Sequence, residues 1–280
     1  MPQSRHSVVS PSLGRDAGES KITQLQSEPY LSIVIPSYNE ERRLPGTLSK
    51  VTAYLQAKGR SAEIWVVDDG SSDHTTAVVE QASAANPMVH LIRNEHRGKA
   101  YAVRTGMLAA SGQFVLFSDA DGATPIEEAD KLLPYLEEGA DVAIASREGK
   151  DARRFDEPWH RHIMGRVFNL IVRLLAVPGI HDTQCGFKAF RRQAARDLFG
   201  NMQLYGETTA GPVKGAMLTG FDVEILFLAR KWGHRIVEVP VHWSYGAESK
   251  VHPIKDSWRN LRDVLLVRWN DLRGRYRRPA

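Results

Sequence analysis

Cysteine is almost absent from this chain of 280 residues, since Cys185 is the only one. A single thiol excludes an internal disulfide framework and any zinc site built from several cysteines. We expect Cys185 to be a small buried hydrophobe. The fold must therefore be stabilised by a hydrophobic core, for which 42% hydrophobic residues suffice in a chain of this length.

Long hydrophobic runs are also missing. The longest candidate, residues 168–180, is interrupted by Arg173 and Pro178, whereas a membrane-spanning helix needs about 18 or more apolar residues in succession. The first residues contain no hydrophobic segment of the kind found in secretory signal peptides. We therefore expect no membrane-spanning helix, no signal peptide and a cytoplasmic location.

The sequence lacks the familiar glycine-rich phosphate motifs. No G-x-G-x-x-G follows a predicted strand, and residues 97–100, Arg-Gly-Lys-Ala, lack the first glycine and the Ser or Thr of a P-loop. The G-x-S-x-G sequence of α/β-hydrolases is absent as well. A bound diphosphate would therefore have to be neutralised by a metal ion and basic side chains.

The net charge of +4 is unevenly distributed. Residues 250–280 contain nine Lys or Arg and three Asp, a net charge of +6, which leaves −2 for the rest of the chain. A nucleic-acid-binding protein with a basic body is therefore excluded, and a protein with a basic tail is favoured. We predict a disordered leader over residues 1–28, one catalytic domain over 29–249 and a basic amphipathic segment over 250–280.

Strands and helices alternate over the first half of the chain. Runs of β-branched and apolar residues predict strands at 31–35, 63–67, 88–92, 113–118 and 142–145, with the first ended by Pro36. Apolar residues at helical spacing predict helices at 44–57, 73–85, 98–110 and 126–137. Helices dominate after about residue 155, at 159–175, 191–199 and 222–232, before a strand at 236–241. This pattern predicts an α/β fold with a mostly parallel central sheet and helices on both faces.

Polar and acidic residues follow three of the predicted strands, at 36–40, 68–73 and 119–121. Ligands of open parallel sheets bind beyond the carboxyl ends of the strands, so these segments should share one edge. Asp119 and Asp121 are hard oxygen ligands separated by the small Ala120, and Tyr38 can stack on a base. The combination predicts a site for a nucleotide and a divalent metal, Mg²⁺ or Mn²⁺.

The motifs together resemble the inverting family 2 glycosyltransferases with a GT-A fold. More narrowly, the chain is similar to the polyprenyl-phosphate sugar synthases, which include dolichyl-phosphate glucosyltransferases and dolichyl-phosphate mannose synthases, and it looks nearer to the glucosyl branch. The similarity extends over about residues 30–255. The segments that carry it are 33–40, 66–73, 118–121, 146–147, 182–188, 220–224 and 248–251.

The resemblance implies a role for each motif. The residues that would line the nucleoside pocket are Pro36, Tyr38, Glu40, Val67 and Asp69. Those that would hold the metal and the donor diphosphate are Asp119, Ala120 and Asp121, of which Asp121 is the expected direct ligand. Arg147 would contact a phosphate of the donor or acceptor, and Lys250 would bind phosphate from a loop. Ser244 stands where some mannose synthases have an arginine, which leaves the donor sugar open.

The activity implied is transfer of a hexose, glucose from UDP-glucose, to a polyprenyl phosphate with inversion. A phosphate monoester is largely dianionic at pH 7 because its second pKa is about 6, so a strong general base is less necessary. Asp182 would orient the acceptor or act as the base, and Arg147, Lys188 and Lys250 would balance the phosphate charges. The alternatives are GDP-mannose as donor, a soluble acceptor, or a nucleotide-sugar-binding module without turnover.

Structural explanations compete with these roles. Asp68 and Asp69 can stabilise a turn, and Asp182 can cap a helix or pair with Lys188 or Arg191. Glu224 can form a helix-face salt bridge instead of contacting an acceptor.

In the tail, apolar residues recur at helical spacing with cations between them: Ile254, Trp258, Leu261, Leu265 and Leu272. Such a helix can pack on the domain, or it can lie on the anionic inner face of a membrane and hold the protein there peripherally.

Overall fold

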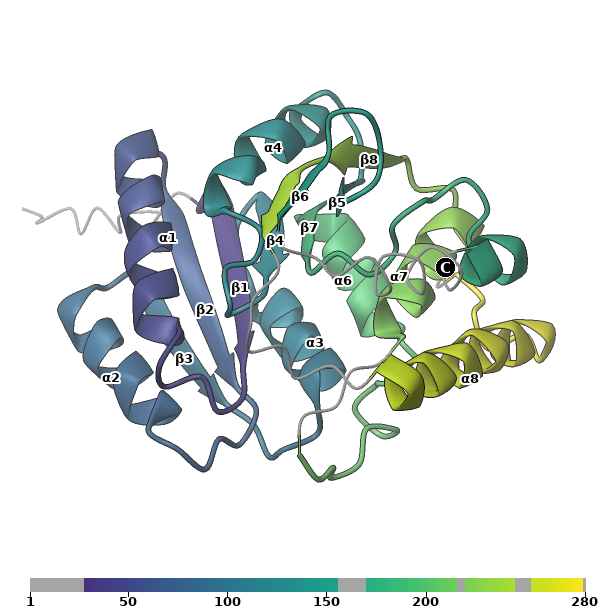
Figure 1. Ribbon diagram of the computed structural model, residues 1–280, viewed down its shortest axis with the longest axis horizontal. Helices are drawn as coiled ribbons and strands as arrows, with labels where there is room; N and C mark the ends of the chain where they lie inside the picture. The colour runs from purple at the N-terminus through teal and green to yellow at the C-terminus, as the bar shows by residue number, and fades with distance from the viewer. Residues whose placement is uncertain (1–27, 156–169, 216–219, 245–252, 279–280) are drawn as a thin grey trace, which may run out of the picture.

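The computed structural model describes residues 28–155, 170–215, 220–244 and 253–278. A seven-stranded sheet in the order β3-β2-β1-β4-β7-β5-β8 forms its centre (Figure 1). The strands are β1 (Leu31–Ser37), β2 (Ala62–Asp68), β3 (Val89–Arg93), β4 (Phe114–Ser118), β5 (Val142–Ser146), β7 (Phe187–Arg191) and β8 (Ile236–Pro240). All neighbouring pairs are parallel except those of β7 with β4 and β5. The predicted fold class is confirmed.

Helices cover both faces of the sheet, and each face has its own hydrophobic core. On one side lie α1 (Leu44–Lys58), α2 (Thr75–Ala85) and α4 (Ala129–Glu137), the last preceded by a 3₁₀ turn at Ile126–Glu128. On the other side lie α3 (Lys99–Ala109), α6 (Arg192–Gly200) and α7 (Phe221–Lys231). The central strands are buried on both faces, which explains their mostly apolar sequences.

Pro36 does not end the first strand as predicted, because β1 continues to Ser37. The register between β1 and β4 stops at the pair Val34 and Phe117. Pro36 lies beyond that pair, so its missing N–H removes no ladder hydrogen bond to β4.

The prediction that helices dominate after residue 155 is incomplete. The antiparallel strand β7 is inserted between β4 and β5, and its first residue, Phe187, is paired with Ser118 at the end of β4. A small two-stranded sheet pairs β6 (Arg153–Phe155) with β9 (His242–Ser244). Of the predicted helix 159–175, residues 170–175 are described, and they are helical.

The tail forms the helix α8 (Pro253–Leu272), which packs against α7 (Figure 1). Val264 and Val267 are fully buried in the core on that face of the sheet. Within the described part of the chain, no helix combines the length and apolar character that crossing a bilayer requires.

Candidate active site

The polar segments that follow β1 and β2 are bonded to each other at the carboxyl edge of the sheet. The backbone N–H of Asn39 donates to Ser71 Oγ at 2.9 Å, and Ser72 N–H donates to Asn39 Oδ1 at 2.8 Å. Asn39 adopts a left-handed backbone conformation with φ of 54°, which Asn tolerates better than most residues. The structure therefore brings the first two predicted motifs together.

Asp68 and Asp69 have different surroundings. Asp68 accepts hydrogen bonds from Ser71 N–H and from the Thr76 hydroxyl, so it stabilises the turn that leads into α2. Asp69 is 2% exposed and accepts bonds from the N–H groups of Arg97 and Gly98 at 3.0 and 2.8 Å. Burial raises the pKa of Asp69 although these donors oppose the shift. The turn explanation thus fits Asp68, whereas Asp69 connects β2 to the start of α3.

Tyr38 and Asp69 meet through His96. The imidazole stacks on the Tyr38 ring with centroids 3.9 Å apart and planes 1° from parallel. Its Nδ1 lies 2.7 Å from Asp69 Oδ2, and its Nε2 lies 3.0 Å from the Gly215 carbonyl oxygen. Sequence reasoning missed His96, because a lone histidine between Glu95 and Arg97 has no motif of its own.

The other residues expected at the nucleoside pocket differ in exposure. Pro36 and Val67 are buried and paired in register between β1 and β2, so they belong to the wall beneath the edge. Glu40 is partly exposed, and its carboxylate binds the Arg43 guanidinium through contacts of 2.7 and 2.6 Å.

Asp119, Ala120 and Asp121 follow β4. Lys99 Nζ lies 2.5 Å from Asp119 Oδ1, and the Thr47 hydroxyl donates to the Ala120 carbonyl at 2.7 Å. Desolvation by the surrounding protein and the nearby Asp119 carboxylate raise the pKa of Asp121. Burial would lower the pKa of Lys99, but the Asp119 carboxylate outweighs it and the pKa is raised. The two aspartates thus form an electronegative pair whose charge Lys99 partly balances.

Gly186 makes room for the Asp119 side chain. A Cβ atom on residue 186 would lie 2.0 Å from Asp119 Oδ2, and the Gly186 carbonyl accepts a bond from Asp119 N–H at 3.1 Å. The antiparallel start of β7 beside the end of β4 creates this approach. The carboxylate can occupy its position only because residue 186 has no side chain.

The partly exposed Arg147 and the buried Asp182 form an ion pair at the end of β5. Arg147 donates from its backbone N–H and Nε to Asp182 Oδ2 at 2.9 and 2.7 Å, and from Nη2 to Oδ1 at 2.9 Å. Asp182 is 0% exposed; burial opposes its ionisation, but Arg147 outweighs burial and holds the pKa of this carboxyl well below its usual range. A carboxylate so occupied is a weak base. Arg147 also lies over the Trp243 ring.

Two other expected groups lie inside the protein. Lys188 is 1% exposed and donates to the Cys185 carbonyl and to Asp222 Oδ1, both at 2.6 Å. The expectation that Lys188 faces substrate phosphates is therefore wrong. Glu224 is fully buried, and it accepts bonds from Gln203 N–H and the Tyr276 hydroxyl at 2.6 and 2.7 Å, not a helix-face salt bridge. Cys185 is buried as expected.

Lys250 lies outside the described residues. Ser244, at the end of β9, is exposed.

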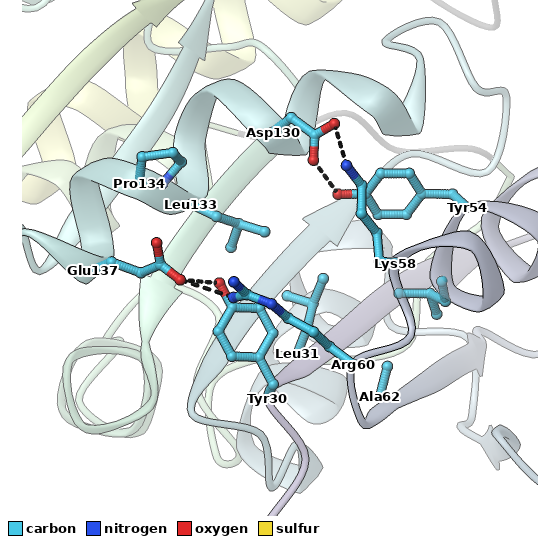
Figure 2. A pocket seen from close by; sticks show the side chains of 11 residues that line it. Tyr30, Leu31, Tyr54, Lys58, Arg60, Ala62, Asp130, Leu133, Pro134 and Glu137 are labelled. Carbon is cyan, nitrogen blue, oxygen red and sulfur yellow. Dashed lines mark hydrogen bonds and ion pairs between the residues drawn. The ribbon is translucent and has the colours of Figure 1, made fainter.

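A depression at the opposite, amino edge of the sheet is lined by paired charges (Figure 2). Asp130 accepts bonds from the Tyr54 hydroxyl and Lys58 at 2.9 and 2.7 Å. Glu137 accepts bonds from the Tyr30 hydroxyl and Arg60 at 2.7 and 2.8 Å. Both carboxylates are therefore satisfied, and the carboxyl edge is the better candidate for chemistry.

Known proteins match most of this chain. The model of glycosyl transferase family 2 matches residues 32–199. The dolichyl-phosphate beta-glucosyltransferase of Dictyostelium discoideum is 34% identical over 263 residues, which are 88% of this chain and 76% of that protein. The human protein of the same name is 34% identical over 266 residues, or 88% of this chain and 77% of that protein.

Solved structures share the fold at lower identity. Mannosyl-3-phosphoglycerate synthase from Rubrobacter xylanophilus superposes with a TM-score of 0.62 at 19% identity, over 88% of this chain and 75% of that one. Glucosyl-3-phosphoglycerate synthase from Mycobacterium tuberculosis in complex with UDP superposes with a TM-score of 0.59 at 18% identity. The superposition covers 85% of this chain and 80% of that one. The family model covers more than half of the chain, and both relatives are over 30% identical across most of it, so the chain belongs to glycosyl transferase family 2.

Proposed function

We propose that this protein transfers glucose from UDP-glucose to the phosphate of a polyprenyl lipid such as dolichyl phosphate, with inversion at the anomeric carbon. The observation that carries the proposal is the Asp119 and Asp121 pair at the end of β4, placed against Lys99 beside the edge that holds Tyr38 and Asp69. The relatives that match most of the chain are named dolichyl-phosphate beta-glucosyltransferases.

The donor nucleoside would bind along the ends of β1 and β2. Tyr38 offers a ring for stacking, and Asp69 offers a buried carboxylate to a base N–H. His96 lies against both groups, so its ring must form part of this pocket or move aside when a base enters. The walls beneath would be Pro36 and Val67, with Glu40 at the rim.

A divalent cation fits the chemistry of Asp119 and Asp121. Among the described residues, no group of three or more His, Cys, Asp or Glu side chains is arranged to hold a metal alone. Mg²⁺ sites with one or two carboxylates plus substrate phosphates need no larger protein cage. The space that Gly186 leaves for the Asp119 carboxylate supports a geometrically defined ligand. Bound Mg²⁺ or Mn²⁺ would supply positive charge to the leaving diphosphate.

The acceptor phosphate would attack as a nucleophile without a strong general base from the protein. An acceptor phosphate oxygen attacks the anomeric carbon from the face opposite the diphosphate, the bond from that carbon to the diphosphate oxygen breaks, and UDP leaves. Because a phosphate monoester is already largely ionised at pH 7, no proton need be removed. We assign Asp182 to holding Arg147, whose guanidinium would contact a substrate phosphate, and Lys250 to binding phosphate as well.

The lipid acceptor places the enzyme at a membrane. A polyprenyl phosphate presents its phosphate at the headgroup level, so a protein that uses it must touch a bilayer surface. We propose peripheral contact with the anionic cytoplasmic face.

A donor panel tests the proposed function. Purified protein is incubated with Mn²⁺, either UDP-glucose or GDP-mannose, and either polyprenyl phosphate or 3-phosphoglycerate, and the glycosylated product is identified by mass spectrometry. We expect a hexosyl-phosphate lipid from UDP-glucose, lost in Asp119→Asn. The matched control is Asp130→Asn, which removes a carboxylate from the amino edge (Figure 2) and should leave transfer intact. Transfer from GDP-mannose alone, or to 3-phosphoglycerate alone, would contradict the proposal.

A further inference from the structure

The side chains of α8 depart from the usual distribution between the packed side and the outer side of a surface helix. The side that packs on the protein includes three polar residues, Asn260, Asp263 and Asn270, which are 7%, 4% and 6% exposed, beside Val264 and Val267. A surface helix ordinarily directs its apolar stripe to the core and its polar residues to solvent. The polar packed side indicates that the outer side of α8 has a separate purpose.

Large apolar side chains form a stripe on that outer side. Trp258, Leu265, Trp269 and Leu272 are 72%, 54%, 51% and 76% exposed. Their spacings of seven, four and three residues place them on one face of an α-helix. The expectation that the tail packs on the domain is met by one set of residues, which contacts α7, and a different set faces outward.

The charge on this outer surface is positive. Arg262, Arg268 and Arg273 are exposed next to the stripe, and the Arg273 guanidinium lies 4.5 Å from the Trp269 ring centroid. The described acidic residues of α8 are withdrawn from it. Asp263 is buried, and Asp271 pairs with Lys231 and Arg268. Over residues 258–273 the outer surface therefore combines tryptophan, leucine and arginine, while the two carboxylates of that range are buried or paired.

We propose that this outer face of α8 and of the turn that follows it, defined by Trp258, Arg262, Leu265, Trp269, Leu272 and Arg273, binds the surface of an anionic bilayer with the helix lying in the plane of the interface. Interfacial helices combine these features: an apolar stripe that enters the acyl boundary, tryptophan at headgroup level, and cations for acidic lipids. A symmetric contact with a second copy would bring like-charged arginines together, which disfavours that occupant.

The helix is bonded to the segment next to the candidate active site, so docking would orient the site toward the lipid. Asp263 accepts bonds from the Tyr205 hydroxyl at 2.6 Å and from Gly220 N–H at 2.9 Å. Gly220 precedes α7, whose Asp222 binds Lys188 and, together with Asp119, raises the pKa of Lys99. The choice of a lipid surface rests on the proposed function, because the acceptor phosphate would be presented at that same surface.

Vesicle co-sedimentation of the full chain tests the surface. We expect binding to phosphatidylcholine vesicles that contain phosphatidylserine, and much weaker binding to phosphatidylcholine alone. Replacing two cations, Arg262→Gln with Arg273→Gln, should lower the partition coefficient about 25-fold on the anionic vesicles. Leu265→Glu with Leu272→Glu should lower it at least about a hundredfold. These side chains are exposed, so circular dichroism and melting temperature should remain unchanged.

Matched controls lie on other helices. Tyr135→Glu on α4 changes an aromatic side chain that is 38% exposed, and Lys50→Gln on α1 removes an exposed cation. Neither should alter vesicle binding. Equal binding by wild type and the Leu265→Glu, Leu272→Glu variant would overturn the proposed surface. So would a dimeric wild type that the same variant converts to a monomer, because the face would then bind a second copy.

A transfer assay separates this inference from the proposed function. A short-chain polyprenyl phosphate dissolved in detergent micelles requires no bilayer docking. We expect the α8 variants to transfer glucose to it at the wild-type rate. Vesicle binding without transfer to any lipid phosphate would refute the proposed function and leave the docking surface standing. Transfer in micelles without vesicle binding would refute the docking surface and leave the proposed function standing.

Discussion

Replacing Gly186 by alanine should displace the Asp119 carboxylate. The added Cβ would lie 2.0 Å from Asp119 Oδ2 and 2.4 Å from its Cγ, whereas ordinary contacts begin near 3.4 Å. The carboxylate must therefore move by about 1 Å or more. Such a shift exceeds the roughly 0.2 Å tolerance of metal–ligand distances and separates Asp119 from Lys99. We expect metal affinity to fall about 10- to 100-fold and transfer to fall about 100-fold.

Calorimetric titration with Mn²⁺ in the presence of UDP measures the metal affinity, and the transfer rate is measured in parallel. The control is Gly200→Ala at the end of α6, where an added Cβ meets nothing within 4 Å. Gly200→Ala should bind Mn²⁺ and transfer glucose as wild type does. Wild-type metal affinity in Gly186→Ala, with the fold intact, would refute the assignment of Asp119 as a ligand held by this contact.

Three further substitutions probe charged side chains at or near the site and in the core. Asp182→Asn leaves Arg147 without its anion, so the free energy of unfolding in urea at pH 7 should fall by about 3 kcal/mol. The KM for the acceptor should rise, and an unchanged KM would contradict the role of Asp182 in positioning Arg147. Lys99→Met removes the cation that competes with a metal ion for Asp119. The affinity for Mn²⁺ in the absence of donor should therefore rise about tenfold, and a lower affinity would contradict that competition. Burial raises the pKa of Glu224 to about 7, so the folded state keeps a proton that the unfolded state loses near pH 4.5. From pH 4.5 to 7.5 the unfolding free energy of the wild type should therefore fall by about 3 kcal/mol more than that of Glu224→Gln; equal pH profiles would refute the assignment.

The parallel part of the fold could be predicted because its strands are short apolar runs separated by helices. Two of them, β1 and β4, are buried on both faces and contain little but apolar residues. The antiparallel β7 could not be found in this way. Its sequence, Phe-Lys-Ala-Phe-Arg, includes Lys188, a charge that a buried strand tolerates here because Asp222 on α7 neutralises it. That pairing joins residues 34 positions apart and leaves no local signal.

The candidate site likewise contains some residues that the sequence predicts and others that it does not. Asp69, Asp119 and Asp121 follow predicted strands, so the rule for parallel sheets placed them at one edge. Lys99 and Gly186 reach Asp119 from α3 and from the start of β7, and only the three-dimensional arrangement joins them. The residues 97–100 contain Lys99 but lack a P-loop pattern, so its pairing could not be inferred.

The tail shows what helical spacing alone can and cannot predict. It predicted an amphipathic helix but not its orientation. The structure turns Val264 and Val267 toward α7 and leaves Trp258 and Leu265 exposed. The free energy of that choice depends on partners in α7 and in the segment that holds Tyr205, which are distant in sequence.

The most direct test of the central claim is the anomeric configuration and mass of the lipid product. Wild-type protein is supplied with UDP-α-glucose and polyprenyl phosphate, and the product is examined by ¹H NMR and mass spectrometry. We predict one hexose added to the lipid phosphate with a β-anomeric signal, together with an equal amount of UDP. An α-linked product, or UDP released with free glucose and an unmodified lipid, would contradict the account.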